Sequence, residues 1–337
     1  MRGVIMHAPH DVRVEDRENP TIIEPTDAII RVTASCICGS DLWPYRGTDK
    51  VADTPMGHEY VGIVTEIGDD VREIKIGDFV VGSFFASDNT CEICQAGYQS
   101  RCVHATGLDG TQAEYARIPF ADGTLVATPG QPDADLIPSL LAASDVLGTG
   151  WFAAVAAEAG PGKTVAVVGD GAVGLLGILA AKQLGAERII AMSRHADRQA
   201  LAREFGATDV VKERGDAGVD KIKELTNGLG AHSVIEAVGT QESMMQAIRA
   251  TRPGGHVGYV GVSHDVELPG LELFFSGVHL HGGPAPVRRF LPQLIQLIWD
   301  RTIDPGKVFD LALPLERAAD GYKAMDERRA TKVLLMV

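Results

Sequence analysis

A glycine-rich turn in the second half of the chain constrains the fold more than any other sequence feature. The segment GDGAVG occupies residues 169–174, directly after the apolar run 164–168, and it opens a long apolar stretch, 172–185. Its first glycine suits a tight turn, the second lets a ligand approach the backbone, and the third lets a helix pack closely on a strand. A helix that begins here directs free N–H groups at an anion. This context predicts a dinucleotide-binding βαβ unit. The expected cofactor contacts are Gly169, Gly171, Ala172, Val173 and Gly174.

The pattern of apolar and polar residues changes near Leu147. Before it, short alternating runs rich in Val, Ile and Thr are bounded by Gly, Pro or Asp, as in a β-rich, barrel-like domain. After it, apolar strands such as 188–193 alternate with helices such as 195–206. This alternation predicts an α/β, doubly wound parallel sheet of the Rossmann type. Further on, 289–303 reads as a helix interrupted by Pro292.

The end of the second strand bears on which dinucleotide binds. An NAD site places an acidic residue about 20 positions after the glycines to hold the ribose 2′-hydroxyl. Here that position is Ser193, followed by Arg194, His195 and Arg198. A hydroxyl and guanidinium groups suit a 2′-phosphate, so we expect NADP(H) to be preferred over NAD(H). The alternative is a solvated helix start in which Asp197 balances the arginines.

Composition excludes several classes of partner. Lys and Arg number 31 against 45 Asp and Glu, a net charge of −14 that argues against nucleic acid and anionic membrane surfaces. The longest apolar run, 172–181, is about half of a membrane span of ~20 residues. We see no secretory signal in the first 16 residues and expect a cytoplasmic protein. All five cysteines lie between Cys36 and Cys102, which favours metal ligands or reactive thiols over disulfides.

Two short motifs add a second kind of chemistry. Cys38 lies in CICGSD (36–41), and His58 lies in GHEYVG (57–62). A thiolate and an imidazole suit zinc, and a catalytic zinc needs a third protein ligand and one open position. Together with a cysteine lobe ahead of a dinucleotide fold, these motifs resemble the zinc-dependent medium-chain alcohol dehydrogenases. The resemblance runs end to end. It implies a GroES-like β-barrel catalytic domain over 1–147, with 283–337 returning to it, and a Rossmann coenzyme domain over 148–282.

The resemblance also implies a catalytic site. By position, Cys38 and His58 match zinc ligands, and the stretch before the helix into the coenzyme domain points to Asp145 as the third. Glu59 matches the carboxylate behind the metal. Asp41 is expected to orient His58, and Ser40 is expected to relay the substrate proton. Trp43 stands where several relatives have a His, and its indole, unlike a His ring, cannot shuttle a proton. The implied reaction moves a hydride between NADP(H) and an alcohol or carbonyl compound.

The cysteine lobe matches the family's structural zinc site in three of four positions. Cys91, Cys94 and Cys102 match, and Asp88 stands where the family has a further cysteine. A carboxylate is an acceptable zinc ligand, so we expect a structural zinc held by one Asp and three Cys. The alternative is a lobe without metal and with free thiols.

Other family features are carried over more loosely. Val260, Gly261 and Val262 match the strand end beside the nicotinamide, the segment 279–281, with His281, matches the backbone that holds the carboxamide, and Lys332 matches a basic residue on the pyrophosphate. A homodimer or homotetramer is expected through the edge strand of the coenzyme domain. Two other functions remain open: a zinc-free quinone or enoyl reductase, and an NADPH-binding redox sensor.

Overall fold

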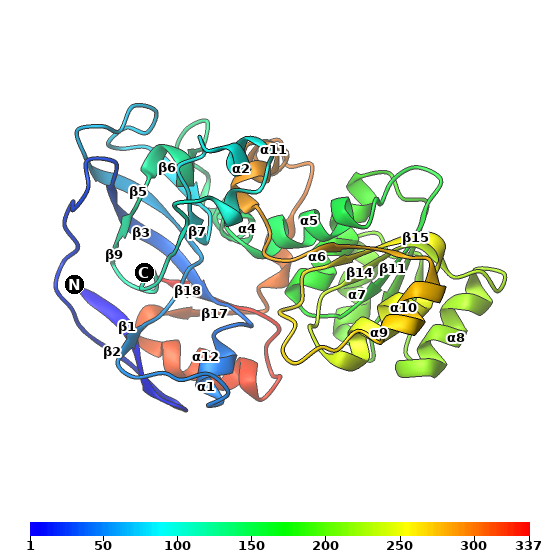
Figure 1. Cartoon of the computed structure of the whole chain (residues 1–337). Helices are drawn as coiled ribbons and strands as arrows, with labels where there is room; N and C mark the ends of the chain where they lie inside the picture. Colours follow the sequence, from blue (N-terminus) through cyan, green and yellow to red (C-terminus); the bar gives the residue numbers. More distant parts are fainter. The chain divides into compact units, whose positions relative to one another are not determined.

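The structure is a computed structural model that describes every residue from Met1 to Val337. The chain forms two compact units, one made of Met1–Asp145 with Pro286–Val337 and the other of Val146–Ala285. The expected boundaries, 147/148 and 282/283, lie within three residues of these. Figure 1 shows that the first unit contains both the blue and the red ends of the chain.

The first unit is a β-barrel of the GroES-like type. Its largest sheet has the order β10-β6-β5-β3-β18-β17, with β9 also paired to β3, and a smaller sheet has the order β2-β1-β4. The long strand β3 (Ala28–Ile37) is central because it pairs antiparallel with both β5 (Tyr60–Ile67) and β18 (Val333–Met336). The other strands are β1 (Arg2–Ala8), β2 (Asp11–Asp16), β4 (Thr54–Pro55), β6 (Phe79–Gly82), β7 (Phe85–Ala86), β8 (Thr106–Gly107), β9 (Tyr115–Ile118), β10 (Leu125–Ala127) and β17 (Leu311–Pro314).

Helices of this unit are short apart from three. These three are α4 (Ile137–Ala143), α11 (Val287–Trp299) and α12 (Ala318–Asp326), and the short ones are α1 (Leu42–Tyr45), α2 (Glu92–Gln95) and α3 (Ala121–Thr124). The expected interruption at Pro292 is wrong, because α11 continues through that residue. Proline removes one helical hydrogen bond, and the buried apolar side of α11, which includes Phe290, Leu291 and Leu294, offsets that loss.

The second unit is a six-stranded parallel sheet of order β13-β12-β11-β14-β15-β16. Its strands are β11 (Thr164–Val168), β12 (Arg188–Met192), β13 (Asp209–Val211), β14 (Ala231–Glu236), β15 (Thr251–Tyr259) and β16 (His279–Gly282). Its helices are α5 (Val146–Ala156), α6 (Ala172–Gln183), α7 (Ala196–Glu204), α8 (Gly215–Leu225), α9 (Gln241–Ala250) and α10 (Gly270–Ser276). The order reverses beside β11, the first strand, which is where such sheets bind ligands at their carboxyl ends.

None of the helices is by itself both long and apolar enough to cross a bilayer, whereas the bent pair 134–143 and 146–156 meets the criterion by length and composition alone.

Candidate functional site

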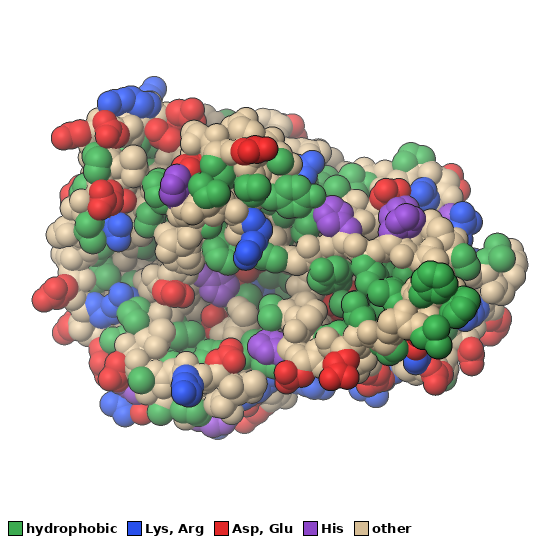
Figure 2. All heavy atoms as spheres, viewed as in Figure 1, with side chains coloured by type: hydrophobic (Ala, Val, Ile, Leu, Met, Phe, Trp, Pro, Cys, Tyr) green, Lys and Arg blue, Asp and Glu red, His purple; other side chains and the backbone are tan.

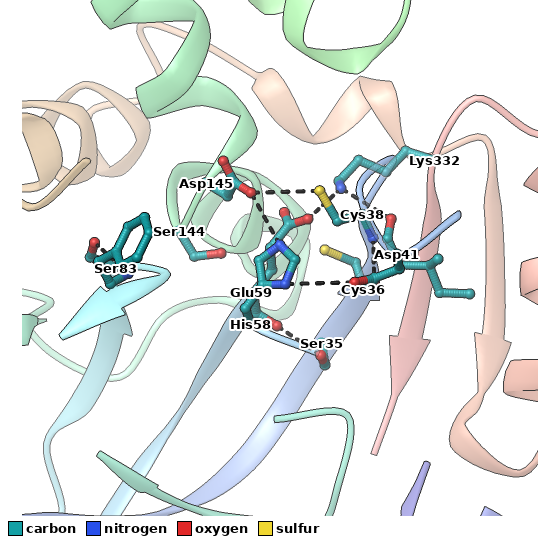
Figure 3. A network of polar contacts seen from close by, with 12 residues as sticks. Ser35, Cys36, Cys38, Asp41, His58, Glu59, Ser83, Ser144, Asp145 and Lys332 are labelled. Carbon is teal, nitrogen blue, oxygen red and sulfur yellow. Dashed lines mark hydrogen bonds and ion pairs between the residues drawn. The ribbon is translucent and has the colours of Figure 1, made fainter. Parts of the chain in front are cut away.

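Four side chains far apart in the sequence meet at one end of the barrel. Cys38 follows β3, His58 and Glu59 precede β5, and Asp145 follows α4. Their potential metal-binding atoms all lie within 4.8 Å of one another (Figure 3). The Asp145 Oδ2 atom lies 3.7 Å from Cys38 Sγ and 3.5 Å from His58 Nε2. The expected ligands Cys38, His58 and Asp145 therefore come together, with Glu59 beside them.

These separations fit a four-coordinate zinc ion. With Zn–S near 2.3 Å and Zn–N or Zn–O near 2.0–2.2 Å, tetrahedral geometry places an S and an O ligand about 3.6 Å apart, and an N and an O ligand about 3.4 Å apart. The two observed distances to Asp145 lie within about 0.1 Å of these values. The donor set of one thiol, one imidazole and one carboxylate also matches the preferences of zinc.

Charge in this cluster favours a cation. Burial raises the pKa of the Cys38 thiol, and the Glu59 and Asp145 carboxylates raise it further. Burial alone lowers the pKa of His58, but the neighbouring Cys38 and Asp145 raise it well above the usual value. Several acidic groups thus share one buried volume, which is costly unless a positive charge sits among them. A divalent metal ion would supply that charge.

A buried ion pair lies beneath the cluster. The Lys332 Nζ atom donates to Glu59 Oε1 at 2.7 Å and to the Ile37 carbonyl at 3.2 Å, and the two side chains are 1% and 0% exposed. Glu59 Oε2 is buried with no hydrogen-bond partner. Lys332 directly precedes β18, and the β3–β18 register pairs Val333 with Ile37, which brings this lysine to the centre. Lys332 therefore has a different partner from the expected pyrophosphate.

A second polar layer holds the imidazole. Asp41 Oδ1 lies 3.6 Å from His58 Nδ1, and its Oδ2 accepts from the Cys38 backbone N–H at 3.0 Å and from Gln112 Nε2 at 3.3 Å. Tyr322 in turn donates its hydroxyl to Gln112 Oε1 at 3.0 Å. Asp41 thus lies where a residue that orients His58 is needed. Sequence reasoning missed Gln112 and Tyr322, which lie outside every motif.

The other expected residue near this centre lies in the turn after Cys38. Ser40 is half-buried, and its carbonyl accepts from the Trp43 backbone N–H at 3.1 Å. Phe84 also borders the cluster, with its ring 6.2 Å from the His58 ring. An apolar ring therefore stands next to the candidate metal ligands.

The cysteine lobe forms a second cluster. The donor atoms of its four residues lie within 4.8 Å of one another, and the pairs Cys91 Sγ–Cys102 Sγ and Cys94 Sγ–Asp88 Oδ1 are 3.8 and 3.5 Å apart. Tetrahedral zinc predicts about 3.8 Å for two thiolates and about 3.6 Å for a thiolate and a carboxylate. His104, which sequence reasoning missed, places Nδ1 2.7 Å from Asp88 Oδ2.

Backbone N–H groups in this lobe favour the deprotonated forms of two of its candidate metal ligands. Those of Val103 and Cys94 lower the pKa of the Cys91 thiol to about 7. Although burial opposes it, hydrogen bonds from the Thr90 backbone and from His104 hold the pKa of Asp88 well below its usual value. Zinc binds the deprotonated forms of both side chains.

The glycine-rich turn has the form that the sequence predicts. Gly169 has φ of +117°, in the region that favours glycine. A Cβ atom at Gly174 would lie 2.0 Å from the Gly169 carbonyl oxygen, so helix α6 can pack against the turn only with glycine there. Gly171, the N-cap of α6, has no atom within 4 Å of the place its Cβ would take. This open space beside the helix N-terminus is where a pyrophosphate would be held, with Ala172 and Val173 in the first turn of α6.

Two of the residues after β12 that were expected to contact a dinucleotide already interact with Asp170. Ser193 is buried, and its hydroxyl donates to Asp170 Oδ2 at 2.7 Å. Arg198 Nη1 lies 3.2 Å from Asp170 Oδ1. Arg194 is exposed and His195 is the N-cap of α7. Asp170, the middle residue of the first Gly-x-Gly, was not considered as a site residue from the sequence.

The remaining expected contacts lie at the same carboxyl edge of the sheet. Residues 260–262 follow β15, and the backbone N–H groups of Val260 and Gly261 donate to the Glu236 carbonyl at 2.9 and 3.3 Å. Glu236, also missed, is fully buried at the end of β14, and its side chain accepts from the next turn. Val262 is 57% exposed, and His281 lies on edge strand β16.

Comparison with known proteins assigns both halves of the chain. The model of the alcohol dehydrogenase GroES-like domain matches residues 24–129, and that of the zinc-binding dehydrogenases matches residues 172–300. The chain is 35% identical to zinc-type alcohol dehydrogenase B of Aspergillus flavus, covering 99% of this chain and 81% of that protein. It is 32% identical to the NADP-dependent isopropanol dehydrogenase of Thermoanaerobacter brockii, over 91% of each. The structure of alcohol dehydrogenase TADH from Thermus sp. ATN1 is similar over the full length of both chains, with a TM-score of 0.91 and 31% identity.

Proposed function

The chain belongs to the zinc-dependent medium-chain alcohol dehydrogenases, an oxidoreductase family, and from this premise we propose that it transfers a hydride between NADP(H) and a small alcohol or carbonyl compound. The observation that carries the proposal is the convergence of Cys38, His58 and Asp145 at distances that suit one tetrahedral ion. The zinc-free quinone or enoyl reductase alternative has no use for this donor set.

In this proposal each residue has a defined task. When bound, zinc would act as the Lewis acid that lowers the pKa of the alcohol hydroxyl, and the dinucleotide would provide the hydride carrier. Cys38, His58 and Asp145 hold the ion, while Asp41 keeps the His58 ring in its ligating orientation. Ser40 Oγ takes the substrate proton and passes it to water, since the indole of Trp43 cannot carry a proton.

The substrate side of the proposal rests on one neighbour of the metal cluster. The rings of Phe84 and Phe85 are 5.0 Å apart, and the first of them stands beside His58. Such an apolar wall favours a small apolar alcohol, aldehyde or ketone over a charged substrate, because burying an unpaired charge against it is costly.

Cofactor choice is proposed to be NADP(H), with NAD(H) as the weaker ligand. Arg194, which is exposed, and Arg198, which is half-buried, supply two guanidinium groups after β12, where an NAD site has a carboxylate. The similarity to an NADP-dependent isopropanol dehydrogenase supports this preference.

We further propose that the lobe holds a structural zinc through Asp88, Cys91, Cys94 and Cys102. The support is the fit of the Cys91–Cys102 and Cys94–Asp88 donor separations to a tetrahedral ion. A closed site of four protein ligands leaves no position for substrate, so its contribution is to folding rather than to catalysis.

A homodimer or homotetramer is the proposed assembly. Strand β16 is the edge of the parallel sheet, and α10 buries none of its residues. Leu271, Phe274 and Phe275 on this helix are 74–77% exposed, and Figure 2 shows hydrophobic side chains gathered over it. Apolar patches of this kind mark protein interfaces. Light scattering should report a smaller assembly for the double variant Phe274→Ser, Phe275→Ser.

Metal analysis combined with NADPH oxidation tests the proposed function. The wild type should contain one zinc for each of the two clusters and should oxidise NADPH in the presence of some member of a panel of aldehydes and ketones. Cys38→Ser should lose one zinc and all turnover. Cys36→Ser, which removes a buried thiol outside both clusters, should keep both ions.

The redox-sensor alternative makes a different prediction in the same experiment. A sensor would bind zinc and NADPH and would turn over no carbonyl compound or alcohol. That result, with full metal content, would overturn the enzymatic proposal and leave the binding function standing.

A further inference from the structure

The adenosine-ribose end of the nucleotide site contains a carboxylate that the arrangement of glycines does not require. Asp170 lies between Gly169 and Gly171, at the end of β11, next to the end of β12 in the parallel sheet. Its two oxygens take separate partners: Oδ2 accepts from the Ser193 hydroxyl at 2.7 Å, and Oδ1 lies 3.2 Å from Arg198 Nη1. The Asp170 side chain is 11% exposed and that of Arg198 is 17% exposed.

In this arrangement the Ser193 hydroxyl and the Arg198 guanidinium, which would favour a 2′-phosphate, already have Asp170 as a partner. The single proton of the Ser193 hydroxyl is already donated to a carboxylate, so it is not available to a phosphate oxygen. Arg198 has part of its charge compensated by the same carboxylate. Arg194 alone remains exposed among the groups that we expected to favour the phosphate.

The carboxylate also acts directly. A 2′-phosphate bound near Ser193 would add about two negative charges within a few ångströms of Asp170, and this repulsion is strong in a partly buried site. A ribose 2′-hydroxyl at the same place would find a hydrogen-bond acceptor, which is what an acidic residue at the end of β12 provides in NAD sites.

We propose that Asp170 is a selectivity residue that narrows the preference of this chain for NADP(H) over NAD(H), so that both dinucleotides bind. This inference rests on the proposed dinucleotide function and concerns its adenosine end only. Asp170 holds Ser193 and Arg198 in the conformation seen here and opposes the extra phosphate.

The test is direct binding of cofactor fragments to the intact protein, which does not depend on catalysis. Isothermal titration with 2′,5′-ADP and with 5′-ADP measures the preference for the 2′-phosphate in the wild type and in Asp170→Asn. The asparagine keeps the shape of the side chain and removes its charge. The ratio of the two dissociation constants should shift by about tenfold toward 2′,5′-ADP, and the shift should shrink at high salt as charge effects do.

Asp197→Asn is the matched control. Asp197 lies in the first turn of α7, one residue before Arg198, is exposed, and is not within hydrogen-bond distance of Ser193 or Arg198. This variant removes the same charge from an exposed position, and its ratio of the two dissociation constants should change by no more than about twofold because exposed charges are well screened.

Ser193→Ala provides a second test that does not depend on the folding of the Asp170 variant. If the hydroxyl is committed to Asp170, its removal from the wild type leaves the affinity for 2′,5′-ADP within about twofold. A tenfold loss would overturn the proposal. So would an unchanged ratio in Asp170→Asn, or a shift toward 5′-ADP, which would mean that Asp170 positions Arg198 for the phosphate. Failure of the wild type to bind either nucleotide would instead overturn the dinucleotide function itself, and this inference with it.

Discussion

Replacing Lys332 by methionine tests whether the ion pair beneath the metal cluster is a structural element of the barrel. The lysine and Glu59 are 1% and 0% exposed, and their charged atoms are 2.7 Å apart. Burial opposes the charged form of Lys332, yet the neighbouring Cys36 and Glu59 hold its pKa well above the usual value. Methionine keeps most of the side-chain volume, so the variant removes the charge and leaves the packing nearly unchanged.

The expected loss is large because an unpaired carboxylate remains inside the barrel. Removing one partner of a buried pair costs about 3–5 kcal/mol, and Glu59 already has one buried oxygen without a hydrogen-bond partner. For a domain of this size that corresponds to a fall in Tm of about 6–20 °C. Calorimetry and urea titration measure the two quantities independently.

Two further variants separate the pair from general effects. Lys323→Met changes an exposed lysine on α12, whose nearest carboxylate atom, on Glu327, is 3.9 Å away, and it should cost under about 0.5 kcal/mol. Adding Glu59→Gln to Lys332→Met removes the unpaired charge and should recover a large part of the stability. If the free energy of unfolding of Lys332→Met lay within about 1 kcal/mol of the wild-type value, the argument that this buried pair stabilises the barrel would be refuted.

Three other predictions follow from the same structure. Arg188 holds the pKa of Asp209 below its usual value, so the stability that this pair contributes is present above about pH 4 and is lost as the pH falls through the lower folded pKa. Asp209→Asn should therefore lower the free energy of unfolding, measured by urea titration, by about 1 kcal/mol or less at neutral pH and should leave it unchanged in strong acid. Gly171→Ala should fold normally and lose nucleotide affinity by titration, whereas Gly174→Ala should lower Tm even without nucleotide, because only the second Cβ meets the turn. A zinc chelator should lower the Tm of the wild type by more than it lowers that of Cys102→Ser, which begins less stable and keeps only the ion held by Cys38, His58 and Asp145; a wild-type Tm that ignores the chelator would contradict a structural zinc.

Local chemistry explains why much of the second unit could be predicted from the sequence. The strand at 164–168 and the helix that begins at 172 follow each other closely in the sequence. The glycines between them are required by the backbone conformation and packing of this one turn, which depend on residues nearby in the chain. The Pro292 interruption was wrong for the opposite reason, since the apolar side of α11 is buried against distant residues that periodicity does not reveal.

The expected phosphate contact of Lys332 and the omission of Asp170 have the same physical cause. Lys332 was expected at a phosphate, but its partner Glu59 is 273 positions away and is reached only through the pairing of β18 with β3. Asp170 was not considered as a site residue, although the neighbouring strand β12 brings Ser193 to it. In both cases the chemistry of the residue was visible in the sequence, and its partner was decided by the register of strands distant along the chain.

Strand register also decides whether the metal cluster can exist at all. β3 pairs Ser35 with Tyr60 on one side and Ile37 with Val333 on the other, so the residues one step beyond each pair, Glu59 and Lys332, converge on Cys38. A shift of either partner strand by one residue would turn these side chains to the opposite face of the sheet, because side chains alternate along a strand. The candidate ligands come from short turns that have little internal structure, and the antiparallel ladders on both sides of β3 are what hold those turns in place. Substitutions that weaken the β3–β18 ladder should therefore reduce zinc content, even where they lie far from every ligand.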